Sequence, residues 1–224
     1  MLRKDGIYAR YIKRALDIVC SGLALILLCW LYAIIAILVR VKLGSPVIYR
    51  ADRPGKINPK TGQEKIFHLY KFRSMTNEKD ENGKLLPDTK RLTRFGRFLR
   101  ATSLDELPEL VNILLGDMSI VGPRPLAKSY LQYYSEEEHH RHDVRPGLTG
   151  LAQVNGRNSL SWEEKFRYDL EYTHTISFAL DVKIILKTIQ KVLSHDGIGQ
   201  GEDAPVSLSN ERKKGDGEAA CGQK

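Results

Sequence analysis

The sequence predicts an α+β fold that is predominantly helical, with one short β-hairpin and one membrane-embedded helix near the N-terminus. Three observations predict this class. A charge-free apolar run covers residues 18–39, β-forming residues cluster at 47–50 and 66–73, and most other apolar residues recur at helical spacing. We expect a membrane-embedded segment with basic flanks at 1–43, a globular domain at 44–196 and a polar tail at 197–224.

Composition limits what the protein can be. The 224 residues are 42% apolar and 28% charged, which suits one domain with appendages. The mean hydropathy of −0.32 excludes a polytopic membrane protein. A formal net charge of +8 predicts an anionic partner, such as a phosphate compound, a nucleic acid or a lipid surface. Three cysteines do not form a secreted disulfide framework and indicate reducing conditions.

The apolar run at 18–39 would form a helix roughly 33 Å long, enough to match a bilayer core. Basic residues lie on both sides, including Arg14 before the run and Arg40 after it, so the positive-inside rule favours neither orientation. A re-entrant helix would keep both basic ends on one side. The run has no proline, and Ser21-Gly22 is its weak break, so a straight span remains the alternative.

The rest of the chain reads as short elements. Two strands at 47–50 and 66–73 bracket a Pro/Gly/Asn-rich loop at 53–63. Helical spacing, followed in one case by a stop at Gly116, predicts helices at 91–100, 104–115, 126–134, 161–172 and 180–193. Glycine-rich residues 145–157 read as a loop, and the polar, glycine-rich residues from 197 onward read as disordered.

Two adjacent carboxylates, Asp105 and Glu106, stand where the helix at 104–115 would begin. Ser103 and Glu106 have the spacing of a capping box, which would make these acids structural. The chemical alternative is that the helix N-terminus lowers the pKa of Asp105, keeping it ionised as a nucleophile. Two carboxylates beside phosphates need a screening cation, and Mg²⁺ bound through Glu106 is the expected one.

Arginines recur beside turn-forming residues. Two prolines stiffen the backbone around Arg124, which suits bidentate binding of phosphate. Arg145 precedes Pro146-Gly147 and Arg157 follows Gly156. Arg100 ends a row of arginines spaced by three, Arg91, Arg94, Arg97 and Arg100. These side chains either converge on a polyanion or form a solvated basic face and exposed turns.

Several motifs in register give the chain a specific resemblance. They are Asp52-Arg53-Pro54-Gly55, Tyr70-Lys71-Phe72-Arg73-Ser74-Met75, Ser103-Leu104-Asp105-Glu106-Leu107-Pro108, Gly116-Asp117-Met118-Ser119, Val121-Gly122-Pro123-Arg124-Pro125, Arg145-Pro146-Gly147-Leu148-Thr149-Gly150 and Gln153-Val154-Asn155-Gly156-Arg157. The chain resembles the bacterial sugar transferases, small monotopic phosphoglycosyl transferases that act on polyprenyl phosphate. The likeness covers about residues 13–196.

The resemblance implies a reaction. A UDP-sugar, with an N-acetylated amino sugar favoured, gives its sugar-1-phosphate to undecaprenyl phosphate and releases UMP. Asp105 attacks the β-phosphorus to form a covalent phosphosugar-enzyme, Glu106 is associated with Mg²⁺ and proton handling, and the kinetics are ping-pong. Matching positions near the active site are Lys71, Arg100, Arg124, Asp169 and Asp181, while Arg145 and Arg157 are expected to bind substrate phosphates.

The resemblance also implies partners and a location. Binding is expected to a UDP-sugar, undecaprenyl phosphate and the bilayer, not to nucleic acid. Downstream glycosyltransferases and a second copy of the chain are candidate protein partners. The catalytic domain, 44–196, should face the cytoplasm at the bacterial inner membrane.

One position departs from the family pattern. Cys29-Trp30 stands where members of this size carry Ser-Pro midway through the apolar helix. Basic residues at both ends still favour re-entry.

Two other functions compete with the transferase: a sugar-nucleotide hydrolase that transfers to water, and a non-catalytic basic protein that binds membrane surfaces.

Overall fold

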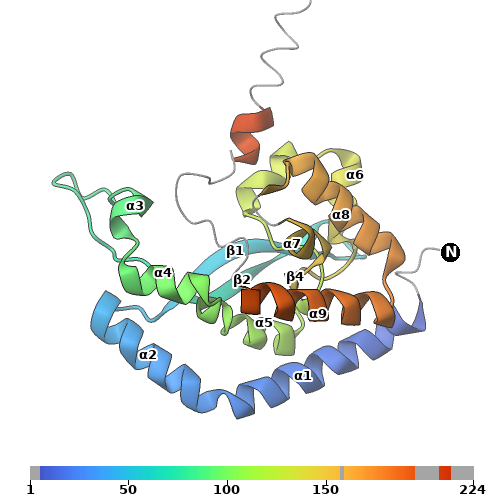
Figure 1. Ribbon diagram of the computed structural model, residues 1–224. Coiled ribbons are helices and arrows are strands. Elements are labelled where there is room, and N and C mark those ends of the chain that lie inside the picture. The colour runs from blue at the N-terminus through green and yellow to red at the C-terminus, as the bar shows by residue number, and fades with distance from the viewer. Residues whose placement is uncertain (1–5, 157–158, 195–206, 213–224) are drawn as a thin grey trace, which may run out of the picture.

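The structure is a computed structural model that describes residues 6–156, 159–194 and 207–212 (Figure 1). The described part is mostly helical and contains two small two-stranded sheets, which confirms the predicted helix-rich α+β class with a β-hairpin. The α-helices are α1 (Lys13–Leu27), α2 (Cys29–Leu43), α3 (Asp88–Arg91), α4 (Arg94–Ala101), α5 (Glu109–Leu115), α6 (Glu136–His139), α7 (Leu151–Asn155), α8 (Trp162–Thr175) and α9 (Phe178–Ser194). The strands are β1 (Ile48–Ile57), β2 (Glu64–Phe72), β3 (Ser119–Val121) and β4 (Gly147–Thr149).

The apolar run forms two helices in place of one. α1 and α2 meet at Leu28, whose φ of −100° and ψ of 7° leave the α-helical region. No single helix among the described residues has the length and apolar composition of a membrane span, but Tyr8–Leu27 and Cys29–Leu43, bent by 64°, meet the criterion together. The break lies immediately before Cys29, whereas Ser21-Gly22 lies inside α1, so the predicted weak break is wrong. Re-entry itself stays a prediction.

Polar side chains of α1 hold it to the globular part. Arg14 donates to the carbonyls of Ile113 and Leu114 at 2.6 and 2.8 Å, and these carbonyls lie near the end of α5. The buried Asp17 carboxylate accepts the backbone N–H of Ile120 at 2.9 Å. Charged side chains of α1 therefore satisfy backbone groups near the end of α5 and within β3.

Apolar side chains of α2 complete a core shared with the hairpin. Ile35, Val39 and Leu43 are buried against Phe72 of β2 and Leu99 of α4. The predicted membrane segment therefore also packs as part of the globular core.

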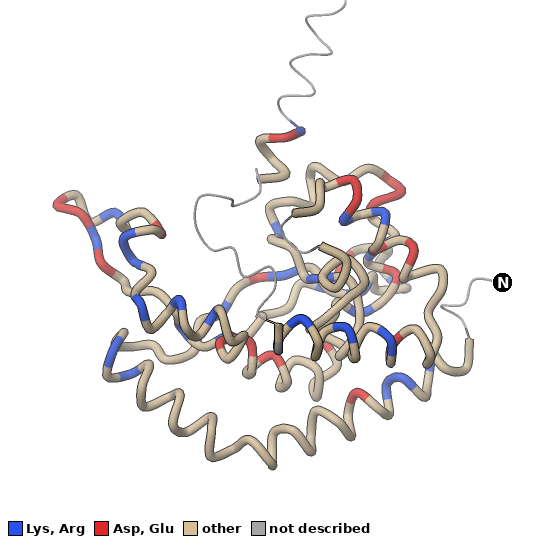
Figure 2. Tube along the Cα trace, viewed as in Figure 1, with Lys and Arg blue, Asp and Glu red and all other residues tan. Residues whose placement is uncertain are grey.

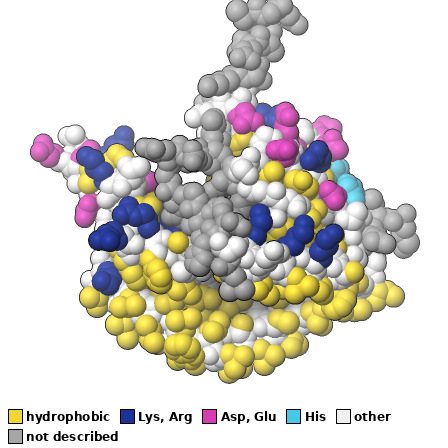
Figure 3. All heavy atoms as spheres, viewed as in Figure 1, with side chains coloured by type: hydrophobic (Ala, Val, Ile, Leu, Met, Phe, Trp, Pro, Cys, Tyr) yellow, Lys and Arg dark blue, Asp and Glu magenta, His cyan; other side chains and the backbone are white. Residues whose placement is uncertain are grey.

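A large apolar face remains exposed along α1 and α2. Ile26, Leu27 and Trp30 are 71, 70 and 60% exposed. Figure 3 shows hydrophobic side chains covering this face, with Lys and Arg side chains above it, and Figure 2 places several of those basic residues along α4 and α9. An apolar face of this extent, bordered by cations, is the surface expected of a protein in contact with a membrane.

The hairpin is longer than predicted. β1 and β2 pair antiparallel from Ile48 opposite Phe72 to Pro54 opposite Ile66, and the register then shifts before Ile57 pairs with Glu64. The predicted loop at 53–63 was therefore too long. The N–H of Arg73 bonds to the carbonyl of Val47, so alternate residues from Val47 onward face β2 and Pro54 faces away. Its missing N–H therefore costs no bond of the ladder.

Two predicted helices are divided. The arginine row spans α3 and α4, because Thr93 caps a new helix by accepting the N–H of Gly96 at 3.0 Å. The predicted helix at 104–115 begins as a 3₁₀ turn, Leu104–Glu106, and becomes α-helical at Glu109. The predicted capping box is wrong: Ser103 adopts a left-handed φ of 56° and its side chain makes no cap.

The glycine-rich segment at 145–157 contains regular structure that the sequence did not indicate. β4 pairs parallel with β3, and α7 follows it. The backbones of this pair approach so closely that a Cβ on Gly147 would lie 2.1 Å from the amide nitrogen of Gly122. Glycine here serves close packing as well as turning.

The C-terminal part agrees with prediction in its helices and departs from it in the tail. α8 and α9 cover the predicted helices at 161–172 and 180–193. Residues 207–212 were expected to be disordered, but Leu208 in this segment is fully buried against Tyr134, Trp162 and Phe166. The remainder of the predicted tail, 197–206 and 213–224, lies outside the described residues.

Candidate active site

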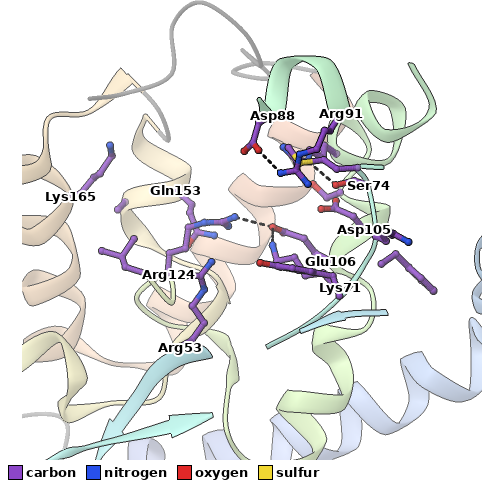
Figure 4. Close-up of a pocket in the computed structure, with 18 of the residues that line it drawn as sticks. Arg53, Lys71, Ser74, Asp88, Arg91, Asp105, Glu106, Arg124, Gln153 and Lys165 are labelled. Atoms are coloured by element: carbon purple, nitrogen blue, oxygen red, sulfur yellow. Dashed lines mark hydrogen bonds and ion pairs between the residues drawn. The ribbon is translucent and has the colours of Figure 1, made fainter. Parts of the chain in front are cut away.

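A cavity of about 760 Å³ opens between the hairpin, α4 and α7–α8 (Figure 4). This volume lies within the usual range for small-molecule sites. Its wall is rich in charged side chains from distant parts of the chain. They are Arg53, Lys71, Arg73, Asp88, Arg91, Arg100, Asp105, Glu106, Arg124, Arg141, Lys165 and Asp169.

Asp105 and Glu106 reach this cavity from the 3₁₀ turn. The left-handed backbone of Ser103 changes the direction of the chain between α4 and the turn. Both carboxylates of the turn then line the cavity. Asp105 is only 7% exposed. The sequence-predicted pair is therefore brought to a cavity, by a turn instead of a helix N-terminus.

Glu106 is held by two cations. Its Oε1 accepts from Lys71 Nζ at 2.6 Å and from Arg124 Nη2 at 2.9 Å. Burial would raise the pKa of Glu106, but the charges of Arg124 and Lys71 outweigh it and hold the pKa at about 2. Glu106 is thus a fixed anion at neutral pH.

Asp105 behaves in the opposite way. Burial and then the negative charge of Glu106 raise its pKa to about 6, against the opposing charges of Lys71, Arg100 and Arg124. The sequence-based expectation of a pKa lowered by a helix N-terminus is wrong, because no regular helix begins at this residue. At pH 7 Asp105 is an ionised carboxylate more basic than an ordinary one, which favours nucleophilic attack.

Positions 122–125 supply the arginine that contacts Glu106. The backbone oxygen of Arg124 accepts from Arg141 Nη2 at 2.7 Å, while its guanidinium points into the cavity (Figure 4). The charge of Glu106 raises the pKa of Arg124. Arg100 donates from Nε to Ser74 Oγ at 2.9 Å on the cavity wall. The structure thus brings six predicted site residues to one cavity wall: Lys71, Arg100, Asp105, Glu106, Arg124 and Asp169.

Comparisons with known proteins identify the family of the chain. The family profile described as bacterial sugar transferase matches residues 8–195, and thus all the residues of the cavity wall. The chain belongs to the bacterial sugar transferase family. One relative is the uncharacterized sugar transferase EpsL of Bacillus subtilis, 50% identical over 84% of this chain and 91% of that protein.

Other relatives of this sugar transferase have names that state their substrates. An undecaprenyl-phosphate galactose phosphotransferase of Salmonella typhimurium is 37% identical over 84% of this chain. A UDP-glucose:undecaprenyl-phosphate glucose-1-phosphate transferase of Klebsiella pneumoniae is 42% identical over 80% of it. The chain spans only 42 and 39% of the lengths of these two proteins.

The sugar transferase site contains a third carboxylate that sequence reasoning missed. Glu109 is 3% exposed and lies 3.0 Å from Lys71 Nζ, so Lys71 bridges Glu106 and Glu109. Burial raises the pKa of Glu109 to about 7, with Lys71 opposing and Glu106 adding to the rise. Its position three residues after Glu106, near one turn of helix, was the available signal.

Asp169 lines the cavity, but its charge is already paired. Its Oδ2 accepts from Arg141 Nε and Nη2 at 3.0 and 2.6 Å, and both side chains are almost fully buried. Arg141 was not predicted, since it stands in a polar stretch between two histidines. This pair braces the cavity wall beneath Arg124.

Two predicted substrate-binding residues that the structure describes, Asp181 and Arg145, do not line the cavity. Asp181 is buried against the N-terminal segment, where it accepts from Lys13 Nζ and Tyr8 Oη at 2.7 Å. Arg145 donates to the carbonyl of Gly116 at 2.9 Å and is absent from the described wall. Arg157 lies outside the described residues.

The carboxylate pair retains capacity for a metal ion. Both cations contact Oε1 of Glu106, and no described residue hydrogen-bonds its Oε2. No cluster of three His, Cys, Asp or Glu that could hold a metal occurs among the described residues. Mg²⁺ needs only one or two carboxylates when phosphates complete its shell, so the Oε2 atom of Glu106 fits this ion.

Proposed function

We propose that the protein transfers sugar-1-phosphate from a UDP-sugar to undecaprenyl phosphate and releases UMP, as the first membrane step of glycoconjugate assembly. The observation that carries this proposal is the buried, basic carboxylate of Asp105 beside a cation-held Glu106 in a cavity rich in arginine. Relatives named for this type of reaction support it.

In the first step an Asp105 oxygen forms a bond to the β-phosphorus of the donor. The bond from that phosphorus to the bridging oxygen breaks, its electron pair stays on the bridging oxygen, and UMP leaves. Lys71 and Arg124 hold Glu106 ionised, so it does not act as an acid here. Mg²⁺ held by Glu106 would neutralise charge on the donor phosphates.

In the second step a phosphate oxygen of the lipid attacks the same phosphorus. The bond to Asp105 breaks and its electrons return to the carboxylate, which gives ping-pong kinetics. The lipid phosphate lies at the membrane interface, where the apolar face of α1 and α2 would hold the cavity. We place this face in the bacterial cytoplasmic membrane, with α1 and α2 re-entrant and the cavity on the cytoplasmic side.

The central experiment is intact-mass measurement of the protein after incubation with UDP-sugar alone. The wild type should gain the mass of one sugar phosphate and release UMP, whereas Asp105→Asn should do neither. An adduct on another residue, or exchange that requires both substrates at once, would contradict the mechanism.

Comparing product formation with and without undecaprenyl phosphate separates the transferase from the hydrolase, which would work equally well without lipid. No turnover by the wild type with any donor would favour the basic membrane-surface protein. The donor panel includes UDP-N-acetylamino sugars, the proposed class, together with UDP-glucose and UDP-galactose, because relatives are named for those sugars.

The topology has its own test. Single cysteines placed near residue 10 and near residue 42 should both resist an impermeant thiol reagent applied to intact cells if the helix pair is re-entrant. Replacing Cys20, Cys29 and Cys221 by serine first removes background labelling. Labelling near residue 10 from outside would exclude re-entry.

A further inference from the structure

Arg53 lines the cavity, and its guanidinium forms no ion pair with a described carboxylate. Three other cations of the wall, Lys71, Arg124 and Arg141, each lie within 3.0 Å of a carboxylate oxygen. No described carboxylate lies within ion-pair distance of Arg53, and its buried Nε has no hydrogen-bond acceptor in the described structure. A partly buried guanidinium group without an ion pair would be stabilised by an anionic ligand.

The charge beside Arg53 strengthens this requirement. Figure 4 shows its side chain rising from β1 next to Arg124, with both guanidinium groups directed toward the centre of the cavity. Burial and the charge of Arg124 lower the pKa of Arg53. Two neighbouring guanidinium groups repel each other. Glu106 hydrogen-bonds to Arg124, whereas Arg53 interacts with Glu109 without forming an ion pair. A phosphate between them would relieve this repulsion and offer each a bidentate partner.

We propose that Arg53 and Arg124 form one phosphate subsite that is used twice in each turnover. The phosphate of the departing nucleoside monophosphate occupies it first, and the phosphate of the polyprenyl acceptor occupies it second. This inference rests on the proposed two-step transfer through Asp105, and it assigns Arg53 to substrate binding in both steps.

The geometry of substitution at phosphorus leads to a shared subsite. Attacking and leaving oxygens lie roughly in line on opposite sides of the phosphorus. In the first step Asp105 forms its bond on one side and the nucleotide oxygen leaves from the other. In the second step the bond to Asp105 is the one that breaks, so the lipid phosphate oxygen must enter from the side that the nucleotide has left.

The test measures the two half-reactions of Arg53→Gln separately, as UMP release with donor alone and as discharge of the preformed adduct by undecaprenyl phosphate. The half-saturating concentrations of donor and lipid should both rise about tenfold to a hundredfold, the loss of a hydrogen bond to a charged group. Arg53→Lys should recover part of both. UMP should compete with the lipid in the wild type and compete more weakly in Arg53→Gln.

Arg50→Gln is the matched control. Arg50 lies on the same strand, is exposed, stacks over the Tyr70 ring at 5.6 Å and is not part of the described cavity wall. This variant removes the same charge and should leave both half-saturating concentrations unchanged. A purely structural role of Arg53 would lower the folded fraction without changing those concentrations.

Three results would overturn the inference: a change confined to the donor, a change confined to the lipid, or no change in either. If Arg53→Gln does not fold, the same comparison with Arg53→Lys decides, since the lysine keeps the charge and loses the planar fork. Failure of the proposed function looks different, because the wild type itself would then form no adduct with donor.

Discussion

Two buried carboxylates, Asp105 and Asp181, show how differently the same chemical group is used in one chain. Asp181 is 4% exposed and saturated: Lys13 and Tyr8 contact its Oδ2, and Tyr172 donates to its Oδ1 at 2.8 Å. Asp105 is almost as buried, yet it lines a cavity and burial raises its pKa to about 6. Burial alone therefore does not mark a reactive group; incomplete compensation beside a cavity does.

The largest expected effect is on Asp105. Asp105→Asn should lower UMP release with donor alone by a factor of about 10³ or more, because it removes the nucleophile. Its thermal unfolding should remain close to that of the wild type. Rapid quench with a labelled donor measures the rate, and a loss of less than tenfold would contradict the role of Asp105.

Asp181→Asn should show the reverse pattern. Removing one partner of a buried ion pair costs about 3 kcal/mol, at the low end of the range because the Lys13 side chain is 12% exposed. Activity per folded molecule should be nearly unchanged. Urea unfolding in detergent measures the loss, and Lys65→Gln, which breaks an ion pair of an exposed lysine with Asp117, should have little effect. If Asp181→Asn lost turnover of the donor without losing stability, Asp181 would have a role in the active site and the prediction would be wrong.

The pH dependence of the first half-reaction sharpens the comparison. Asp105 must be ionised to attack, and its pKa of about 6 means that this form is lost as the pH falls through 6. UMP release should therefore fall about tenfold per pH unit below 6, instead of below about 4 for an ordinary aspartate.

A substitution at Arg100 tests whether the titration of Asp105 sets the midpoint of the pH profile of UMP release. The charge of Arg100 lowers the pKa of Asp105, so Arg100→Gln should move the midpoint upward. A downward movement, or a wild-type midpoint near 4, would contradict the assignment of the titration to Asp105.

The smallest effect is expected at Glu109. Glu109→Gln keeps an acceptor for Lys71 but removes the charge, and it should lower turnover several-fold because Lys71 is then held less firmly against Glu106. Glu109→Leu removes the acceptor and should lower turnover further. Steady-state kinetics compare the two, and equal effects would show that the contact with Lys71 is unimportant.

Several motifs that the sequence singled out meet in space, and the roles of their residues stay predictions. Lys71, Arg100, Asp105, Glu106 and Arg124 meet at one cavity, as the family resemblance implied. The resemblance also placed Asp169 near the active site, but only the structure shows that Arg141 forms an ion pair with Asp169. Asp181 was also expected near the active site, but it lies against the N-terminal segment. Tertiary packing decides which partner binds a carboxylate, and spacing along the chain does not encode that packing.

Local structure was missed for related reasons. Ser103 and Glu106 have capping-box spacing, but Lys71 and Arg124 bind Glu106 more strongly than one backbone amide could, and Ser103 is left-handed. β3 and β4 have three residues each, too few for a periodic pattern. Leu208 was hidden in a polar tail, where one apolar residue gives no signal.

The shared packing of α2 has a practical consequence for handling the protein. Val39 is fully buried, and Ile35 and Leu43 cover Phe72 and Leu99 from the side that faces α2. A fragment beginning after residue 43 would uncover those two side chains and should aggregate. Solubilisation with detergent or nanodiscs, instead of truncation, is the route to an active preparation.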